Sequence, residues 1–294
     1  KYGNYWRVVT MVISVKHKFE RRLGLIPVTF DKDGTLVAHT QFADYPMIMP
    51  NRKIKQVTEL FPGWMMLSYK KSAEASSSLE PNPPSLALNE EIRDYWSAKT
   101  GGKGEWLSVD LGEVKSVKAV QLNFAENNTE LFGRQGILAQ QYLLEYSADK
   151  INWKPLSDQT KNEEDLTHQY HSFKLPVKAR YLKVTNYRVP GGTFAISGFR
   201  VFGQGTGHKP SKVGSIVIKR DANDPRNVTL SWKKQPNATG YNIRFGVQKN
   251  NLTRVYQVYS DTELTIRSLN KDQKYWFAID AFGENGVTPG DVQP

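Results

Sequence analysis

The chain has 294 residues, carries 40 Lys and Arg against 29 Asp and Glu for a formal net charge of +11, and contains no cysteine. This length predicts two or three domains with cores of their own, and the lack of cysteine excludes disulfides, thiol catalysis and thiolate metal sites. The charge divides as +5 in residues 1–62, +1 in 63–206 and +5 in 207–294. Because a nucleic-acid groove gathers Lys and Arg between aromatic residues, this dispersed excess favours an ordinary solvated surface.

Residues 1–62 alternate apolar runs with turns, which predicts strand, turn, strand, hairpin and strand. The stretch KHKFERRLGLIPVTFDKDG at 16–34 resembles the last blade of a family-43 glycoside hydrolase, a five-bladed β-propeller that acts on β-xylosides or α-arabinosides. The resemblance implies substrate-pocket contacts for Arg21, Arg22 and His17, with a surface salt bridge or a strand cap as the structural alternative. The catalytic carboxylates of that family come from earlier blades, so the resemblance implies no catalytic residue in this chain.

Beyond residue 62 the dominant pattern is the alternation of apolar and polar residues, which predicts strands with one buried face. Examples are Val120, Leu122 and Phe124, then Tyr142, Leu144 and Tyr146, and near the end Val228, Leu230 and Trp232. Turn pairs such as Gly101-Gly102 and Asn285-Gly286 lie between these runs. Few segments repeat every 3.6 residues, so the sequence predicts an all-β protein built of sandwiches.

Residues 65–205 carry a series of blocks that resembles a discoidin, or factor V/VIII type C, domain. The blocks are AEASSS at 73–78, LNEEIRDYWSA at 88–98, GEWLSVDLGEVKSVKAVQLNF at 104–124, YLLEYSADKINW at 142–153, ARYLKVTNY at 179–187 and AISGFRVFG at 195–203. The resemblance implies a jelly-roll sandwich of the kind used by many carbohydrate-binding modules. Trp96, Trp106 and Trp153 are expected to be core anchors rather than ligand platforms.

Two loops of this segment combine aromatic rings with polar groups, the mixture that suits sugars, because C–H faces stack on rings and hydroxyls bond to Arg, Asn and Glu. They are Asn127–Gln135 and Asn186–Phe194. The predicted carbohydrate-binding residues are Phe132 and Arg134 in the first loop, and Tyr187, Arg188 and Phe194 in the second. The alternative is that these aromatic residues brace the loops or pack against a neighbouring domain.

The same resemblance implies a structural calcium ion near the ligand end, held by carbonyls, an Asp, a Thr and a Glu. The sequence departs from this pattern, because Asn89 stands where the Asp is expected, Asp94 where the Thr is, and Gly198 in place of the Glu. Hard cations want several charged oxygens. Main-chain carbonyls, Asn89 and Asp94 are therefore the predicted ligands, and no other cofactor is expected.

Residues 211–294 follow a Gly-, Thr- and Pro-containing stretch, Gly203–Pro210, that is typical of an interdomain linker. An early-strand Trp232, and Leu269 six residues before Tyr275, resemble the core tryptophan and tyrosine corner of a fibronectin type III module. Trp232 and Tyr275 are expected in the core. No RGD tripeptide is present, so a spacer or interdomain brace is favoured over adhesion.

Together these resemblances imply the C-terminal, carbohydrate-binding and scaffolding portion of a plant-polysaccharide-degrading glycosidase of the xylosidase or arabinofuranosidase kind. Expected partners are a xylan- or arabinan-like polysaccharide and an upstream catalytic propeller, in a bacterial secreted or periplasmic setting whose signal is not in this chain. Membrane insertion is not predicted, because apolar stretches such as residues 8–15 fall far short of the ~20 residues that span a bilayer. Two alternatives stay open: a non-enzymatic discoidin–fibronectin adhesion or glycan-binding protein, and a chain whose residues 1–62 complete an active site with a separate propeller fragment.

Overall fold

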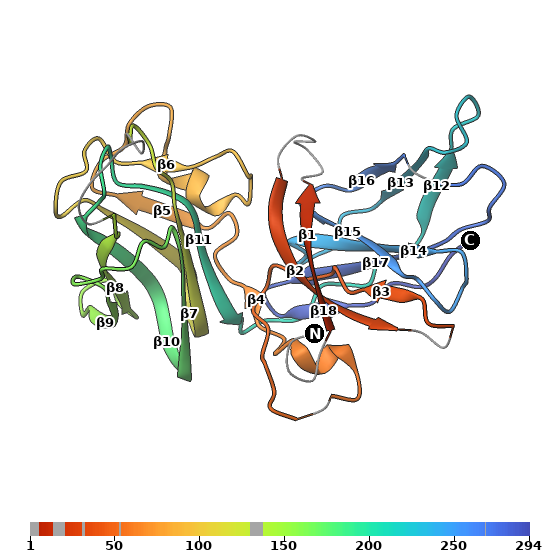
Figure 1. The fold of residues 1–294 in the computed structure, drawn as a ribbon, viewed down its shortest axis with the longest axis horizontal. Helices are drawn as coiled ribbons and strands as arrows, with labels where there is room; N and C mark the ends of the chain where they lie inside the picture. The colour runs from red at the N-terminus through yellow and green to blue at the C-terminus, as the bar shows by residue number, and fades with distance from the viewer. Residues whose placement is uncertain (1–5, 14–20, 31–32, 53, 130–137, 268) are drawn as a thin grey trace. The chain divides into compact units, whose positions relative to one another are not determined.

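The computed structural model describes residues 6–13, 21–30, 33–52, 54–129, 138–267 and 269–294, except for the side chains of residues 6, 10–13 and 21–23. Strands dominate these residues, whose helical turns are η1 (Val57–Leu60) and η2 (Pro84–Leu88) (Figure 1). The predicted all-β fold is therefore confirmed. Within this part of the chain, no helix has the length and apolar character that crossing a bilayer requires.

The chain divides into two compact units, which we call the middle unit, residues 66–205, and the split unit, residues 1–65 together with 206–294. The boundary near residue 205 coincides with the Gly- and Pro-containing stretch at 203–210. The division into three domains at 1–62, 65–205 and 211–294 stays a prediction, because compactness groups the two ends of the chain into one unit.

The middle unit is built on one sheet in the order β4-β11-β7-β10-β8-β9, with β5 paired to β7 and β6 to β11. Its strands are β4 (Met65–Met66), β5 (Ser72–Ala75), β6 (Trp96–Ser97), β7 (Trp106–Phe124), β8 (Gln141–Ser147), β9 (Lys154–Asp158), β10 (His168–Arg188) and β11 (Ala195–Gln204). The long strand β7 pairs with β5 through its first half and with β11 through its second half. Leu107 and Leu122, from the two halves of β7, belong to the same core, so the two halves of the sheet enclose a common apolar core.

Side chains of the middle unit alternate in and out as the period-two pattern predicts. Leu107, Val109 and Leu111 are fully buried, because every second residue of a strand faces the same side. Trp96 is also fully buried, as expected. Trp153, in contrast, is partly exposed, and its indole N–H donates to the Lys150 carbonyl 3.1 Å away. The prediction that Trp153 is a core anchor is therefore wrong.

The described residues of the split unit form three antiparallel sheets. They are β1 (Trp6–Ile13), β2 (Arg21–Phe30) and β3 (Leu36–Ala38); β12 (Ile216–Arg220), β13 (Val228–Trp232) and β16 (Glu263–Ile266); and β15 (Arg254–Tyr259), β14 (Gly240–Gly246), β17 (Trp276–Gly283) and β18 (Gly286–Thr288), each set in spatial order. The last two sheets share one core, in which Trp232 meets Tyr241 edge-on at 5.3 Å between ring centroids. The Tyr275 hydroxyl accepts the Asn270 N–H at 3.2 Å, so Trp232 and Tyr275 lie in the core as predicted.

The two ends of the chain meet in the split unit through residues 42–45. The Phe42 N–H donates to the Gln257 side-chain carbonyl at 3.1 Å, and the Tyr45 and Tyr259 hydroxyls are 2.8 Å apart. The Phe42 ring packs edge-on against Phe282, which is fully buried although it points away from the sandwich core. The outward face of the β15-β14-β17-β18 sheet is therefore covered by the N-terminal part of the chain.

Candidate functional site

Three loops gather at one end of the middle unit, and we call residues 97–105, 125–129 and 186–194 the loop end. Main-chain bonds join them: Phe194 N–H donates to the Thr100 carbonyl at 3.0 Å, and Thr193 N–H to the Asn127 carbonyl at 3.2 Å. The Asn127 side chain adds a bond to the Thr193 hydroxyl at 2.9 Å. Loops tied together in this way offer a fixed surface rather than independent segments.

Asn186 holds the loop end together. Its side chain is fully buried and donates to the carbonyls of Gly101 and Gly102, each at 2.9 Å. Its own N–H donates to the Glu105 carbonyl at 2.7 Å, and its carbonyl accepts the Gly104 N–H at 2.8 Å. One residue thus makes four bonds to the 101–105 segment, which fixes that segment beside the 186–194 loop.

Glycine is required where two of these loops touch. Gly192 has a φ of +68°, and a Cβ there would lie 2.1 Å from the Asn127 carbonyl oxygen. The backbone conformation and the close approach both exclude other residues. The Gly191-Gly192 pair, a turn signal in the sequence, therefore also sets the distance between two loops.

Tyr187 and Arg188 follow Asn186 directly, and both side chains are partly exposed. The exposed Lys103, carried by the segment that Asn186 holds, places its ammonium 4.5 Å from the centre of the Tyr187 ring. This distance is that of a cation–π contact. An aromatic ring and an ammonium are therefore presented together, and Tyr187 and Arg188 were both predicted to be ligand contacts.

Glu105 adds a carboxylate beside the loops. It accepts hydrogen bonds from the hydroxyls of Ser76, Ser77 and Thr100, the last two at 2.8 Å. Burial acts to raise the pKa of Glu105, but these hydroxyl bonds outweigh it and hold the pKa below its ordinary value. Glu105 is therefore an anion at neutral pH whose lone pairs are already used by the protein.

Phe194 is placed differently from the prediction. Its side chain is only 1% exposed and meets Trp96 edge-on, with 5.5 Å between the ring centroids. A ring enclosed in this way cannot stack on a ligand, so Phe194 is a core residue and is not part of the candidate site. Its position at the end of the loop, one residue before β11, explains why it turns inward.

The other predicted site residues fall partly outside the described part of the chain. Phe132, Arg134 and His17 lie outside the described residues. Arg21 and Arg22 begin β2, where their backbones pair with Ile13 and Val12, but their side chains are among those not described. Their roles in sugar or substrate binding stay predictions.

Several residues in the loop end or bonded to it were not predicted from the sequence. Lys103 and Glu105 were not singled out, nor was Tyr95, whose hydroxyl donates to the Asn127 side-chain carbonyl at 3.0 Å. The Gly101-Gly102 turn beside Lys103 was the available signal, because a turn next to charged residues indicates a surface loop. Nothing in the sequence indicated which second loop it would meet.

At the predicted calcium site, the side chains of Asn89 and Asp94 bond to each other. The Asn89 side-chain carbonyl accepts the Glu91 N–H at 2.9 Å, so its amide nitrogen faces Asp94, at 2.6 Å from the carboxylate. A cation at this carboxylate would face an N–H donor instead of a ligand oxygen. A side chain at Gly198 would put its Cβ 2.6 Å from the Asn123 amide nitrogen, so Asn123 would have to move to admit a carboxylate there.

A buried ion pair lies next to these residues. Glu90, adjacent to Asn89, is 3.2 Å from the guanidinium of Arg200, and both side chains are largely buried. Within the described residues, no group of three or more His, Cys, Asp or Glu is arranged to hold a metal. The donor set of Asn89 and Asp94 therefore does not fit a calcium ion, and Arg200 supplies the positive charge in this region.

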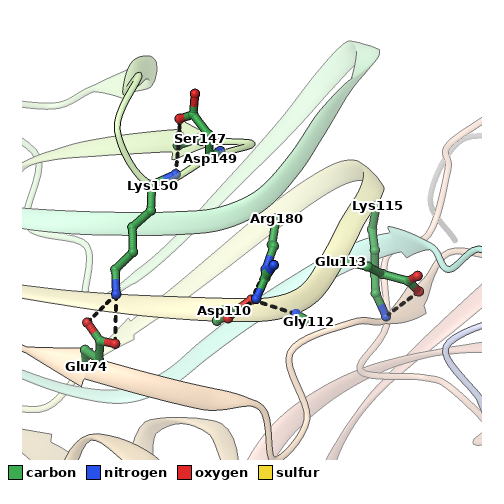
Figure 2. Close-up of polar contacts among 9 residues, drawn as sticks. All are labelled: Glu74, Asp110, Gly112, Glu113, Lys115, Ser147, Asp149, Lys150 and Arg180. Atoms are coloured by element: carbon green, nitrogen blue, oxygen red, sulfur yellow. Dashed lines mark hydrogen bonds and ion pairs between the residues drawn. The ribbon is translucent and has the colours of Figure 1, made fainter.

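A second charged cluster lies farther along the same strands, away from the loop end (Figure 2). Arg180 forms a two-bond ion pair with Asp110 at 2.8 and 2.9 Å, and Lys150 reaches Glu74 at 2.7 Å. The Gly112 N–H also donates to Asp110, at 2.7 Å. Arg180 and Lys150 are each paired with a carboxylate, so this cluster is a set of structural ion pairs rather than a basic binding surface.

The middle unit is thus a β-sandwich module with a braced loop end. Residues 72–197 match the F5/8 type C domain family, so this segment is an F5/8 type C, or discoidin-like, domain. Coagulation factor V of Pseudonaja textilis is 27% identical over 125 residues, a match that covers 40% of this chain and 8% of that protein.

Solved structures with similarity to this chain include two sugar-binding modules. Chitosan-binding module 1 of a chitosanase/glucanase from Paenibacillus sp. IK-5 has a TM-score of 0.40 and 23% identity, and covers 47% of this chain and 99% of its own. The family 32 CBM of C. perfringens NanJ, solved in complex with galactose, has a TM-score of 0.39 and 22% identity, and covers 48% and 99%.

Proposed function

We propose that the middle unit binds carbohydrate at its loop end. The observation that carries this proposal is the partly exposed Tyr187 ring at the end of β10, which lies beside the Lys103 ammonium and precedes Arg188 in the chain, while Asn186 bonds to the 101–105 segment. A partly exposed ring accepts the C–H face of a sugar, and a guanidinium donates to its hydroxyls. Because the loop is braced before any ligand arrives, little ordering is needed on binding.

Within a larger protein, this activity would serve plant-polysaccharide degradation by a xylosidase- or arabinofuranosidase-like glycosidase, secreted or periplasmic. The support is the order of segments, with a three-stranded antiparallel β1-β2-β3 sheet, one strand fewer than a propeller blade, before the discoidin-like domain. The Tyr275–Asn270 bond favours a fibronectin type III-like module after it. The catalytic carboxylates would belong to the propeller, and the polysaccharide bound would be xylan- or arabinan-like.

A binding assay with the full chain tests the proposed function. We expect retention on polysaccharide gels or on a glycan panel, and we expect Tyr187→Ala to weaken it. Tyr170→Ala is the matched control, because Tyr170 is 48% exposed on β10, outside the loop end. Binding that survives Tyr187→Ala, or that falls equally in both variants, would place the site elsewhere. A complete lack of binding across the panel would overturn the proposed function.

A further inference from the structure

We infer that the loop end selects acidic glycans, meaning sugars that carry a carboxylate such as a uronic acid. This inference rests on the proposed function, and it names the chemical class of ligand. It begins with Lys103, whose ammonium lies over the face of the Tyr187 ring. The ring that a sugar would use is therefore already in contact with a positive charge.

This arrangement discriminates between neutral and acidic sugars. A neutral sugar that stacks on that face of Tyr187 displaces the Lys103 ammonium from the ring and offers it nothing in exchange. A sugar with a carboxylate stacks while its anion pairs with the displaced ammonium, so the charge stays satisfied. The specificity arises from Lys103, and Tyr187 supplies contact area to both classes.

The charged residues around Lys103 and Tyr187 also bear on the choice between neutral and acidic sugars. Lys99 and Lys103 are exposed, and among the described residues neither has a carboxylate partner. Arg188 has interactions of its own and is not counted with these lysines, and the acids of the loop end are Glu105 and Glu126. Glu105 accepts three hydroxyl bonds from Ser76, Ser77 and Thr100, so its lone pairs are occupied. In the second charged cluster, by contrast, Arg180 and Lys150 already pair with Asp110 and Glu74 (Figure 2).

The net charge of residues 63–206 is only +1, which by itself favours a neutral ligand. The loop end alone gives the same sum, because Lys99, Lys103 and Arg188 stand against Glu105 and Glu126. The preference for an acidic sugar therefore rests on the position of the Lys103 ammonium over the Tyr187 ring and not on an excess of local charge.

The test compares pairs of oligosaccharides of equal length that differ in charge. One pair is a linear xylo-oligosaccharide with and without a single glucuronate branch, and the other is an oligogalacturonate against a neutral galacto-oligosaccharide. Titration calorimetry on the full chain measures each Kd. We expect the acidic member to bind about fivefold more tightly, the scale of an exposed ion pair. We expect higher salt to reduce the difference.

Two charge-removing variants decide where the preference comes from. Lys103→Gln should remove the difference in Kd between the acidic and the neutral member of each pair. Lys154→Gln, an exposed lysine on β9 outside the loop end, should leave it intact. Equal or tighter binding of the neutral members, or an equal loss in both variants, overturns the inference and leaves the proposed function standing. Failure of every oligosaccharide and of the glycan panel to bind overturns the proposed function itself.

Discussion

Lys115 on β7 gives the clearest quantitative prediction. Its side chain is 3% exposed, and burial, reinforced by the charge of Lys71, lowers its pKa from 10.5 to about 8, while the Glu113 carboxylate at 3.8 Å acts in the opposite direction. At roughly 1.4 kcal/mol per pKa unit, this difference destabilises the folded protein by about 3 kcal/mol when the lysine is charged in both states. Lys115→Met keeps the aliphatic length and removes the charge.

The sign of the pH dependence follows from the two pKa values. Between pH 8 and 10.5 the unfolded chain holds a proton on Lys115 that the folded chain has lost, so stability rises with pH across this window. Below pH 8 the full destabilisation is present. Lys115→Met should therefore raise the free energy of unfolding by up to about 3 kcal/mol at pH 7 and flatten the rise above pH 8. Glu113 is more than half exposed, so losing its partner leaves no buried charge.

Hydrogen exchange of the β7 and β10 amides, measured in the full chain from pH 7 to 10, reports the stability of the middle unit directly. Lys118→Met is the matched control, because Lys118 lies on the same strand and is partly exposed. That variant should leave the profile unchanged. The reasoning is refuted if Lys115→Met destabilises the middle unit, or if its stability still rises between pH 8 and 10.5 as in the parent.

Two further predictions concern residues whose expected roles the structure changes. Phe194→Ala should lower the free energy of unfolding by about 3–5 kcal/mol, because it leaves a cavity in the core. A denaturant titration that shows no loss of stability would contradict the burial of Phe194. Calcium should leave the melting temperature of the full chain unchanged relative to EDTA. An ion bound at 100 times its Kd would add about 2.7 kcal/mol, so a clear upward shift would show that Asn89 and Asp94 hold one after all.

The strands of both sandwiches could be predicted because their signal is local. Alternation at Leu107, Val109 and Leu111 is present in the sequence itself, and the structure buries all three. The tryptophans could not be sorted in this way. Trp96 and Trp153 both end polar stretches, and only the packing of distant segments makes one a core residue and leaves the other partly exposed.

The loop end could be predicted only in part, for a related reason. Tyr187 and Arg188 were predicted because the loop at 186–194 combines aromatic rings with polar groups. The 101–105 segment was not found, because what places it there are bonds from Asn186, some 85 residues away. Lys103 and Tyr187 become partners through contacts between these distant segments, and contacts of such long sequence separation leave no pattern in a single sequence.

The split unit would have a mechanical consequence if the proposed site held an insoluble polymer. The middle unit is inserted into it, with one connection at residues 65–66 and the other at 205–206. Both leave the sandwich from neighbouring strands, because Leu67 N–H, just after β4, donates to the Val201 carbonyl of β11 at 2.7 Å. A pull on a polysaccharide held by the loop end would therefore load two covalent tethers in parallel. A protease that cuts one connection would leave the sugar-binding module still attached through the other.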